Sequence, residues 1–333
     1  MFQPAYKLIM GRKVIDTTDE PKASTVIDLT VNLDLDTPAD RLTLILGQVG
    51  HFQPARDDEV KVELGYADGE DLVQVMAGKI VSLEPGLTVK RVVVYSAAAI
   101  LLRTFVDQTY ENKTAGQIVR DLADRAGVDV ATADSGITFP AYVVNSQRSA
   151  YHHMLDLAEL CGFDLYINAD GEVVFEKFVS GNTVHVFEYG KHILQLELLQ
   201  TPARASLVEA WGESPGGQGG SEAWAWLTKN FSNIKGSAGS GDARFLLERP
   251  ALRTADAART AAVAALTAIQ RRSLRGRLLT LGQPQVKLGD AIRLSGLAED
   301  ALNQRYQVRS VAHHLTKQQG FTTAIGFQSL AST

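Results

Sequence analysis

The stretch Ile27-Asp-Leu-Thr-Val-Asn-Leu-Asp-Leu-Asp36 alternates strictly between apolar and polar side chains. Successive side chains of a β-strand point to opposite faces, so this pattern predicts a strand with one buried and one wet face. The side chains expected to be buried are Ile27, Leu29, Val31, Leu33 and Leu35. The acidic side chains between them, Asp28, Asp34 and Asp36, are expected on the wet face, where solvation alone explains them.

The same alternation continues through the first hundred residues. In 59–66 the apolar positions are every second residue, and 72–83 and 88–96 extend the pattern. Asp68-Gly69 and Pro85-Gly86 lie between these segments and are typical turn sequences. Strands joined by short polar turns, with no helix between them, predict an antiparallel barrel or sandwich.

Two helices and a hairpin are expected next. The segment 114–127 opens with Thr-Ala-Gly-Gln, the spacing of a capping box, and closes on a glycine suited to a helix C-cap. A second helix is predicted over 149–162, again ending at a glycine. The segment 163–178 carries an Asp-Gly turn between two apolar runs, which predicts a hairpin. Residues 104–180 therefore form a small α/β module inserted into a β-rich protein.

The second half of the chain begins and ends with strand patterns. Between them, 212–242 is rich in glycine and serine and is expected to be a long mobile loop. An alanine-rich helix follows over 256–272, with Thr254 as its N-cap. The predicted strands are 184–187, 194–199, 278–281, 291–294, 306–315 and 321–327.

These patterns divide the chain into five segments. They are a first β-barrel over 1–103, the α/β module over 104–180, the first part of a second barrel over 181–211, a loop-and-helix insertion over 212–274, and the closing part of the second barrel over 275–333. One internal echo links the two barrels: Gly65-Tyr-Ala-Asp68 resembles Gly296-Leu-Ala-Glu299. The apolar parity of the preceding strands differs by one residue, so the match requires a bulge or is a coincidence.

Composition and charge exclude several classes of function. The chain has 333 residues, 45% of them hydrophobic, and a net charge of −5, which disfavours a dedicated nucleic-acid binder. Cys161 is the single cysteine, so an intrachain disulfide and a thiolate metal cluster are excluded. The first residues lack the pattern of a signal peptide, and the longest apolar run, 96–102, is too short to span a membrane. The single cysteine fits assembly in a reducing cytoplasm, and we expect no membrane insertion.

The sequence contains no recognisable catalytic or metal-binding motif. Adjacent side chains in His152-His153 and His313-His314 diverge on a helix or strand, so neither pair makes a two-ligand metal site. No nucleophile elbow, P-loop or dinucleotide fingerprint occurs. Cys161 lies near the end of an amphipathic helix and is expected to be a buried structural thiol. We predict no catalytic residues, no cofactor site and no metal site.

An aromatic segment interrupts the glycine-rich loop. Trp224, Trp226 and Leu227 lie in it, and exposed aromatic side chains in loops often anchor partner proteins. The alternative is that they fold back onto their own subunit. We predict that they contact a partner and become ordered when they do.

The order of these segments resembles the late control gene D family of tailed phages, the baseplate hubs of contractile tails, which are related to the N-terminal part of VgrG spikes. The resemblance covers nearly the whole chain and rests on the order and composition of these segments more than on an invariant motif. The segments that carry it are Asp36–Leu42, Met76–Val81, Asn112–Val119 with Ala126-Gly127, Ala150–Phe178, Val286–Leu294 and Tyr306–His313.

The resemblance implies a structural protein. Family members are homotrimers in which each subunit contributes two barrels resembling a tail-tube subunit, so that a sixfold tube is joined to a threefold spike. The resemblance implies a separate trimeric spike protein, the first tail-tube ring and other baseplate proteins as partners. The short length of the chain and its alanine- and arginine-rich composition suit the minimal tail of a simple myophage or an R-type pyocin. The alternatives are a tail-associated cell-wall hydrolase, which peptidoglycan turnover would reveal, and a glycan-binding module, which a glycan screen would reveal.

Overall fold

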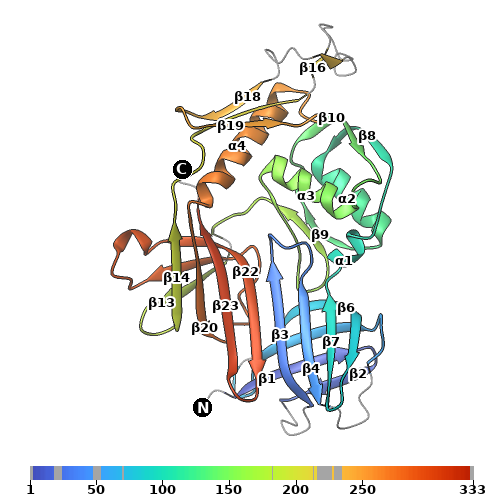
Figure 1. Cartoon of the computed structure of the whole chain (residues 1–333), viewed down its shortest axis with the longest axis vertical. Helices are drawn as coiled ribbons and strands as arrows, with labels where there is room; N and C mark the ends of the chain where they lie inside the picture. Colours follow the sequence, from blue (N-terminus) through green and yellow to red (C-terminus); the bar gives the residue numbers. More distant parts are fainter. Residues whose placement is uncertain are drawn as a thin grey trace.

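Strands dominate the computed structural model of the chain, which describes residues 3–18, 25–47, 54–69, 71–181, 183–212, 214–215, 227–228 and 235–330 (Figure 1). A 13-stranded sheet forms one end of the molecule. Helices α1–α4 and several smaller sheets form the other end. The prediction of a mainly β protein with a small α/β module is confirmed.

The large sheet combines two groups of strands, one from each end of the chain. We call the first group the first lobe: β1 (Pro4–Met10), β2 (Lys13–Asp16), β3 (Val26–Asp34), β4 (Arg41–Gly47), β5 (Glu59–Tyr66), β6 (Val73–Pro85) and β7 (Val89–Tyr95). The second lobe comprises β13 (Val184–Glu188), β14 (Gln195–Gln200), β20 (Leu274–Leu281), β21 (Ala291–Ser295), the short 3-10 helix η3 (Asp300–Leu302), β22 (Arg305–Thr316) and β23 (Gly320–Ser329). The strand order is β14-β20-β23-β22-β3-β4-β7-β6-β5-β1-β2, with β21 beside β22 and β13 beside β21. The two predicted barrels are therefore halves of one continuous sheet.

Strand β3 has the predicted alternation except at its start. Leu29 and Val31 are fully buried, as expected. Ile27, however, is 46% exposed, while its neighbour Val26 is buried. The pairing of β3 with β4 shifts by one residue between Val26 and Asp28, and such a bulge exchanges which side chains face the core. The predicted burial of Ile27 is therefore wrong.

The helices of the α/β module begin and end where their capping residues predict. The module contains α1 (Ala98–Leu101), β8 (Gln108–Thr114), α2 (Ala115–Ala126), β9 (Val130–Ala133), β10 (Thr138–Val144), α3 (Ala150–Cys161), β11 (Asp164–Ile167) and β12 (Val173–Glu176). The hydroxyl of Thr114 accepts a hydrogen bond from the Gln117 amide at 3.2 Å, and the Gln117 side chain accepts one from the Thr114 amide at 3.1 Å. Gly127 and Gly162 end the two longer helices in the left-handed conformation. The predicted capping box is confirmed.

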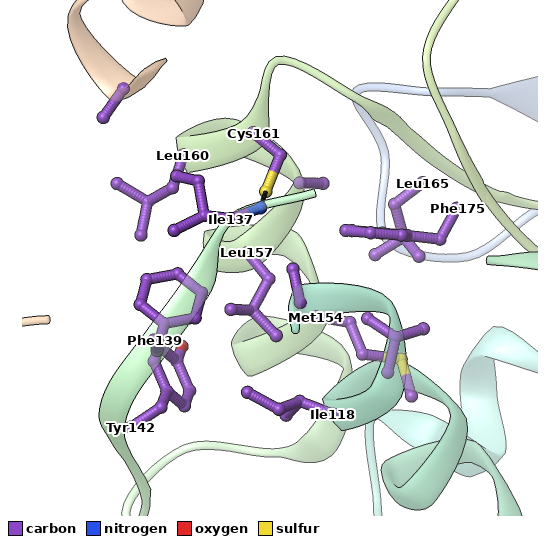
Figure 2. Close-up of a cluster of buried hydrophobic side chains, with 14 of the residues drawn as sticks. Ile118, Ile137, Phe139, Tyr142, Met154, Leu157, Leu160, Cys161, Leu165 and Phe175 are labelled. Atoms are coloured by element: carbon purple, nitrogen blue, oxygen red, sulfur yellow. Dashed lines mark hydrogen bonds between the residues drawn. The ribbon is translucent and has the colours of Figure 1, made fainter. Parts of the chain in front are cut away.

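The module has a hydrophobic core of its own. Ile118 of α2, Leu157 of α3, Phe139 of β10 and Phe175 of β12 belong to this core, and Figure 2 draws them among its buried side chains. All four side chains are fully buried. The same core extends to the inner face of α4 (Ala255–Arg271), so the module and the α4 region pack as one unit.

Helix α4 packs on a small sheet formed by β15 (Leu207–Trp211), β18 (Gly236–Gly239) and β19 (Arg244–Glu248). The two-residue strands β16 (Ser214–Pro215) and β17 (Leu227–Thr228) pair with each other. A Cβ on Gly236 would lie 2.1 Å from the Arg259 backbone nitrogen, so a glycine is required where β18 approaches α4. The prediction of a mobile loop was wrong for Gly236–Gly239, because this backbone pairs with β15 and lies directly on the helix.

Strand β22 joins the two lobes. Along one edge it pairs with β23, and along the other it pairs first with β21 and then with β3. The core beneath the sheet is shared, since it contains Leu29 and Val31 of the first lobe and Val311 and Ile325 of the second. The division of the chain into five segments stays a prediction.

Candidate assembly surface

The two lobes repeat the same strand arrangement. The order β3-β4-β7-β6-β5 in the first lobe corresponds to β14-β20-β23-β22-β21 in the second. In both lobes every neighbouring pair in this series is antiparallel. The two halves of the sheet are therefore candidates for an internal duplication.

The register of the strands agrees with the order. In the first lobe one row of cross-strand partners runs Asn32, Arg41, Tyr95, Lys79 and Glu59. In the second lobe the row through Arg275 runs Leu199, Arg275, Gln328, Gln307 and Ala291. The two rows cross the five corresponding strands in the same order, and we use them to define equivalent positions in the two lobes.

A bulge occurs at the same place in both lobes. The pairing of β6 with β7 shifts between Ile80 and Ser82, and that of β22 with β23 shifts between Val308 and Ser310. Counted from the rows above, these bulges occupy equivalent positions. Bulges are specific features of a sheet, so their coincidence supports a common origin for the lobes.

The turn before the fifth strand is also repeated. The Asp58 carboxylate accepts a hydrogen bond from the Ala55 amide at 2.8 Å, and the Asp290 carboxylate accepts one from the Lys287 amide at 2.9 Å. The preceding residues, Asp57 and Gly289, both have positive φ. The Asp58 and Asp290 carbonyls each accept an amide hydrogen bond of 3.0 Å from the strand with the bulge. The sequence similarity between residues 65–68 and 296–299 is displaced by one residue from the register of the lobes. This displacement explains why the apolar positions of the preceding strands differed by one residue.

A polar network links β22 to the module and to the first lobe. Arg309, the residue in the bulge of β22, donates a 2.9 Å hydrogen bond to Asp164 and a 2.6 Å hydrogen bond to Asp36. Asp164 also accepts a hydrogen bond from Gln307. Burial raises the pKa of Asp164, and the nearby guanidinium groups of Arg309 and Arg271 oppose that rise. This network fixes the module against the place where the lobes meet.

Two aspartates in and just after β3 do more than face solvent. Asp28 forms a 2.9 Å contact with His314, and Asp36 pairs with Arg309. Both partners belong to β22, the neighbouring strand of the other lobe. The prediction that solvation alone explains these carboxylates was wrong, because the sequence does not reveal which strand lies beside β3.

A cavity of about 930 Å³ opens next to the network, between α3, α4, β19 and the start of β20. Its walls carry many guanidinium groups: Arg204, Arg249, Arg259, Arg271, Arg272, Arg275 and Arg309. Three carboxylates, Asp36, Glu159 and Asp164, share the lining. Because guanidinium forks match carboxylate and phosphate geometry, this surface suits an anionic partner.

Neither histidine pair belongs to a group of three or more His, Cys, Asp or Glu side chains that could hold a metal ion, since the described ranges contain no such group. His153 is buried and contacts the Asn145 carbonyl at 3.0 Å, whereas the neighbouring His152 contacts the Ser149 hydroxyl. His313 is fully buried, and burial lowers its pKa to about 3. The two side chains of each pair point in different directions, as expected for adjacent residues of a helix or a strand.

Cys161 packs in the core of the module. Its sulfur accepts a hydrogen bond from the Ile137 amide at 3.3 Å, which Figure 2 shows as a dashed line. Burial raises the pKa of this thiol to about 11. A protonated, buried thiol is a poor nucleophile, so Cys161 is a packing residue.

The predicted partner contacts fall in the glycine-rich segment. Trp224 and Trp226 lie outside the described residues. For Leu227 the structure gives only the backbone, in the two-residue strand β17. Their contact with a partner stays a prediction. Within the described part of the chain, no helix is long and apolar enough to cross a membrane.

Comparison with protein families gives one match along most of the chain. The family model described as the Alg8 N-terminal domain matches residues 29–317. No curated protein matches the chain.

Solved structures of tail proteins share the fold along nearly the entire chain. A 43 kDa tail protein of prophage MuSo2 from Shewanella oneidensis superposes with a TM-score of 0.71 at 13% identity, covering 98% of both chains. A tail protein from Neisseria meningitidis gives 0.72 at 12% identity, covering 98% of this chain and 97% of the other. An E. coli component of the type VI secretion system, described as similar to the T4 tail proteins gp27 and gp5, gives 0.60 at 10% identity, covering 98% and 77%. The fold is that of phage tail proteins.

Proposed function

The chain belongs to the Alg8 N-terminal domain family, and we propose that it is a structural subunit of a contractile phage-like tail, namely its baseplate hub. In this proposal three copies form a ring that adapts the sixfold tail tube to a threefold central spike. The hub assembles in the bacterial cytoplasm and becomes part of the phage or bacteriocin particle. An R-type pyocin or a simple myophage is the proposed setting.

The observation that carries this proposal is the repeat of the two lobes. Two lobes with the same strand order, register and bulge give one chain two similar units. Three such chains in a closed, head-to-tail ring present six similar units, which is the number that a sixfold tube requires. A ring of six identical small subunits could not also present threefold-specific surfaces to a spike, whereas alternating lobes can.

The fold of the tail proteins supports the same proposal. It extends over the module and the α4 region as well as both lobes, since the alignments cover 98% of this chain. The partners in this proposal are a second and third copy, a separate trimeric spike protein, the first tail-tube ring and other baseplate proteins. The arginine-lined cavity supports contact with an acidic surface of one of them.

We propose no catalytic role. The family description names no reaction, and the described His, Cys, Asp and Glu side chains form no group of three that could hold a metal ion. The alternatives, a cell-wall hydrolase and a glycan-binding module, predict turnover of peptidoglycan or saturable binding of a soluble glycan. Either activity, abolished by a single substitution in the purified chain, would contradict the structural role.

Native mass spectrometry of the purified chain tests the number of copies. The mass of one chain is 36.1 kDa, so a trimer is readily separated from a dimer or a hexamer. We expect the trimer, alone or with the spike protein bound at its centre. A chain that remains monomeric at every concentration, with and without the spike protein, would contradict the hub proposal.

A further inference from the structure

Among the strand edges without a partner in the part of the chain that the structure describes, two are related by the internal repeat: the outer edge of β14 and one edge of β6. Strand β14 pairs with β20 along one edge only. Strand β6 pairs with β7 up to Pro85, but on its other edge its pairing with β5 ends at Lys79. The second half of β6 therefore presents backbone donors and acceptors on one side. Unpaired edges of this kind can bind a further strand.

The internal repeat shows what each of these edges corresponds to. The edge of β22 beyond its bulge, Ser310–Thr316, pairs with β3 over Asp28–Asp34. By the register described above, the equivalent of this edge in the first lobe is β6 from Ser82 onward. The equivalent of β3 in the second lobe is β14. Within one chain, β22 pairs with β3. The equivalent strands, β6 in the first lobe and β14 in the second, have no such partner among the described residues, and each could supply the partner that the other lacks.

We propose that β14 of one copy pairs antiparallel with the second half of β6 of the next copy. The register follows from the junction within the chain: Ser310 lies opposite Asp34 there, so Ser82 lies opposite Thr201 between copies. Leu83 then lies opposite Gln200, and Glu84 opposite Leu199. This inference rests on the proposed hub function, because it names the surface through which the copies of that ring meet.

The burial of side chains on β14 agrees with a missing neighbour. Leu29 and Val31 of β3 are fully buried between two strands. Their equivalents in β14, Leu196 and Leu198, are only partly buried. On the outer face of β14, Leu199 is 46% exposed. A strand added at this edge would cover these leucines, as β22 covers those of β3.

Charged side chains lie on both sides of the proposed junction. Arg275 and Arg277 of β20 are exposed and lie directly beside Leu199 and Glu197 of β14. On the opposite edge, β6 carries the exposed Glu84, and the turn before β5 carries the exposed Asp57. Both edges thus carry charges of both signs, since Glu197 lies on β14 and Glu84 is paired with Arg91 of β7 at 3.4 Å. The head-to-tail arrangement therefore rests on the match between the two unpaired edges, and not on charge.

Disulfide trapping tests the register directly. Cys161 is buried, so the background has no accessible thiol. The double variant Ser82→Cys with Thr201→Cys should form covalent trimers on mild oxidation, and reduction should return them to monomers. The matched control is Ser82→Cys with Glu197→Cys, which moves the second thiol four residues along the same face of β14. That displacement is roughly 13 Å, beyond the reach of a disulfide, so we expect about tenfold less trimer from the control.

The outcomes separate this inference from the hub proposal. Covalent trimers from the in-register pair and few from the control support the pairing. An intact non-covalent trimer in which neither pair cross-links, or both cross-link equally, overturns the pairing and leaves the hub proposal standing. A chain that shows no trimer before oxidation, both with and without the spike protein, contradicts both.

Discussion

Asp36 accepts a 2.6 Å hydrogen bond from Arg309, although the two residues lie 273 positions apart in the sequence. Asp36 follows the last residue of β3 closely, and Arg309 occupies the bulge of β22. The same guanidinium also holds Asp164 of the module. One side chain therefore connects both lobes and the module at the point where the sheet passes from one half of the chain to the other.

Replacing Arg309 should destabilise the chain strongly. Arg309→Met leaves the buried carboxylate of Asp164 without its main counter-charge, which costs roughly 3–5 kcal/mol. Asp36→Asn removes a pair whose carboxylate is 59% exposed and should cost less than about 1 kcal/mol. Urea unfolding of both variants checks this difference. Equal losses of unfolding free energy would mean that the network does not fix the junction.

Asp40 should make the stability of the chain depend on pH. Burial raises its pKa to about 7, although the Asp34 amide donates a hydrogen bond to its carboxylate. In the unfolded chain the pKa is about 3.9, so between these values the folded chain binds a proton that the unfolded chain has released. The stabilising contribution is thus complete below pH 4 and is lost as pH rises through 7, by up to about 1.4 kcal/mol per pH unit.

Asp40→Asn removes this titration and should flatten the curve of unfolding free energy between pH 4 and 7. The matched control is Asp57→Asn, at an exposed carboxylate in the turn before β5. Chemical unfolding at several pH values measures both. If Asp40→Asn has the same pH dependence as the unaltered chain, the carboxyl is not protonated in the folded state.

Gly236→Ala should destabilise the packing of β18 on α4. The added methyl group would meet the backbone of Ala258 and Arg259, so strand or helix must move, at a cost of about 1–3 kcal/mol. Gly181→Ala is the control, since nothing lies within 4 Å of its Cβ position. A thermal melt distinguishes the two variants. Indistinguishable melting temperatures would show that β18 does not lie against the helix.

Much of the fold could be predicted from local sequence. The capping box of α2 and the glycines that end α2 and α3 act through neighbouring residues, so they appear in any short window of sequence. Strand β3 was visible because one of its faces is buried and the other is wet. These features depend on interactions between residues close in the sequence, so a short segment is enough to predict them.

The features that could not be predicted from the sequence depend on pairing between strands far apart in the chain. The partners of Asp28 and Asp36 belong to β22, nearly three hundred residues away, and no local pattern indicates that neighbour. The bulge beside Val26 reversed the facing of Ile27 because β4 shifts its register there. The repeat of the lobes was visible only as a faint echo, since strand order and register, rather than residue identity, are what the lobes share.

The tryptophans of the glycine-rich segment should matter only in the assembly. Trp224→Ala combined with Trp226→Ala is expected to weaken binding to a neighbouring subunit or spike by about tenfold or more, because aromatic anchors carry much of the energy of an interface. The unfolding free energy of the isolated chain should change little. Phe105→Ala, at an aromatic residue that is 57% exposed, is the control. Hydrogen exchange over 222–228 that is the same in free and assembled protein would contradict the prediction.

The central claim, that three copies present six similar lobes in one ring, is tested most directly by electron cryo-microscopy of the purified ring viewed along its axis. We predict a threefold ring in which six lobes of similar density alternate between first and second lobe around a common centre, with one strand junction within each chain and one between neighbours. A ring with another number of chains, or a trimer in which only one lobe of each chain surrounds the axis, would contradict the account.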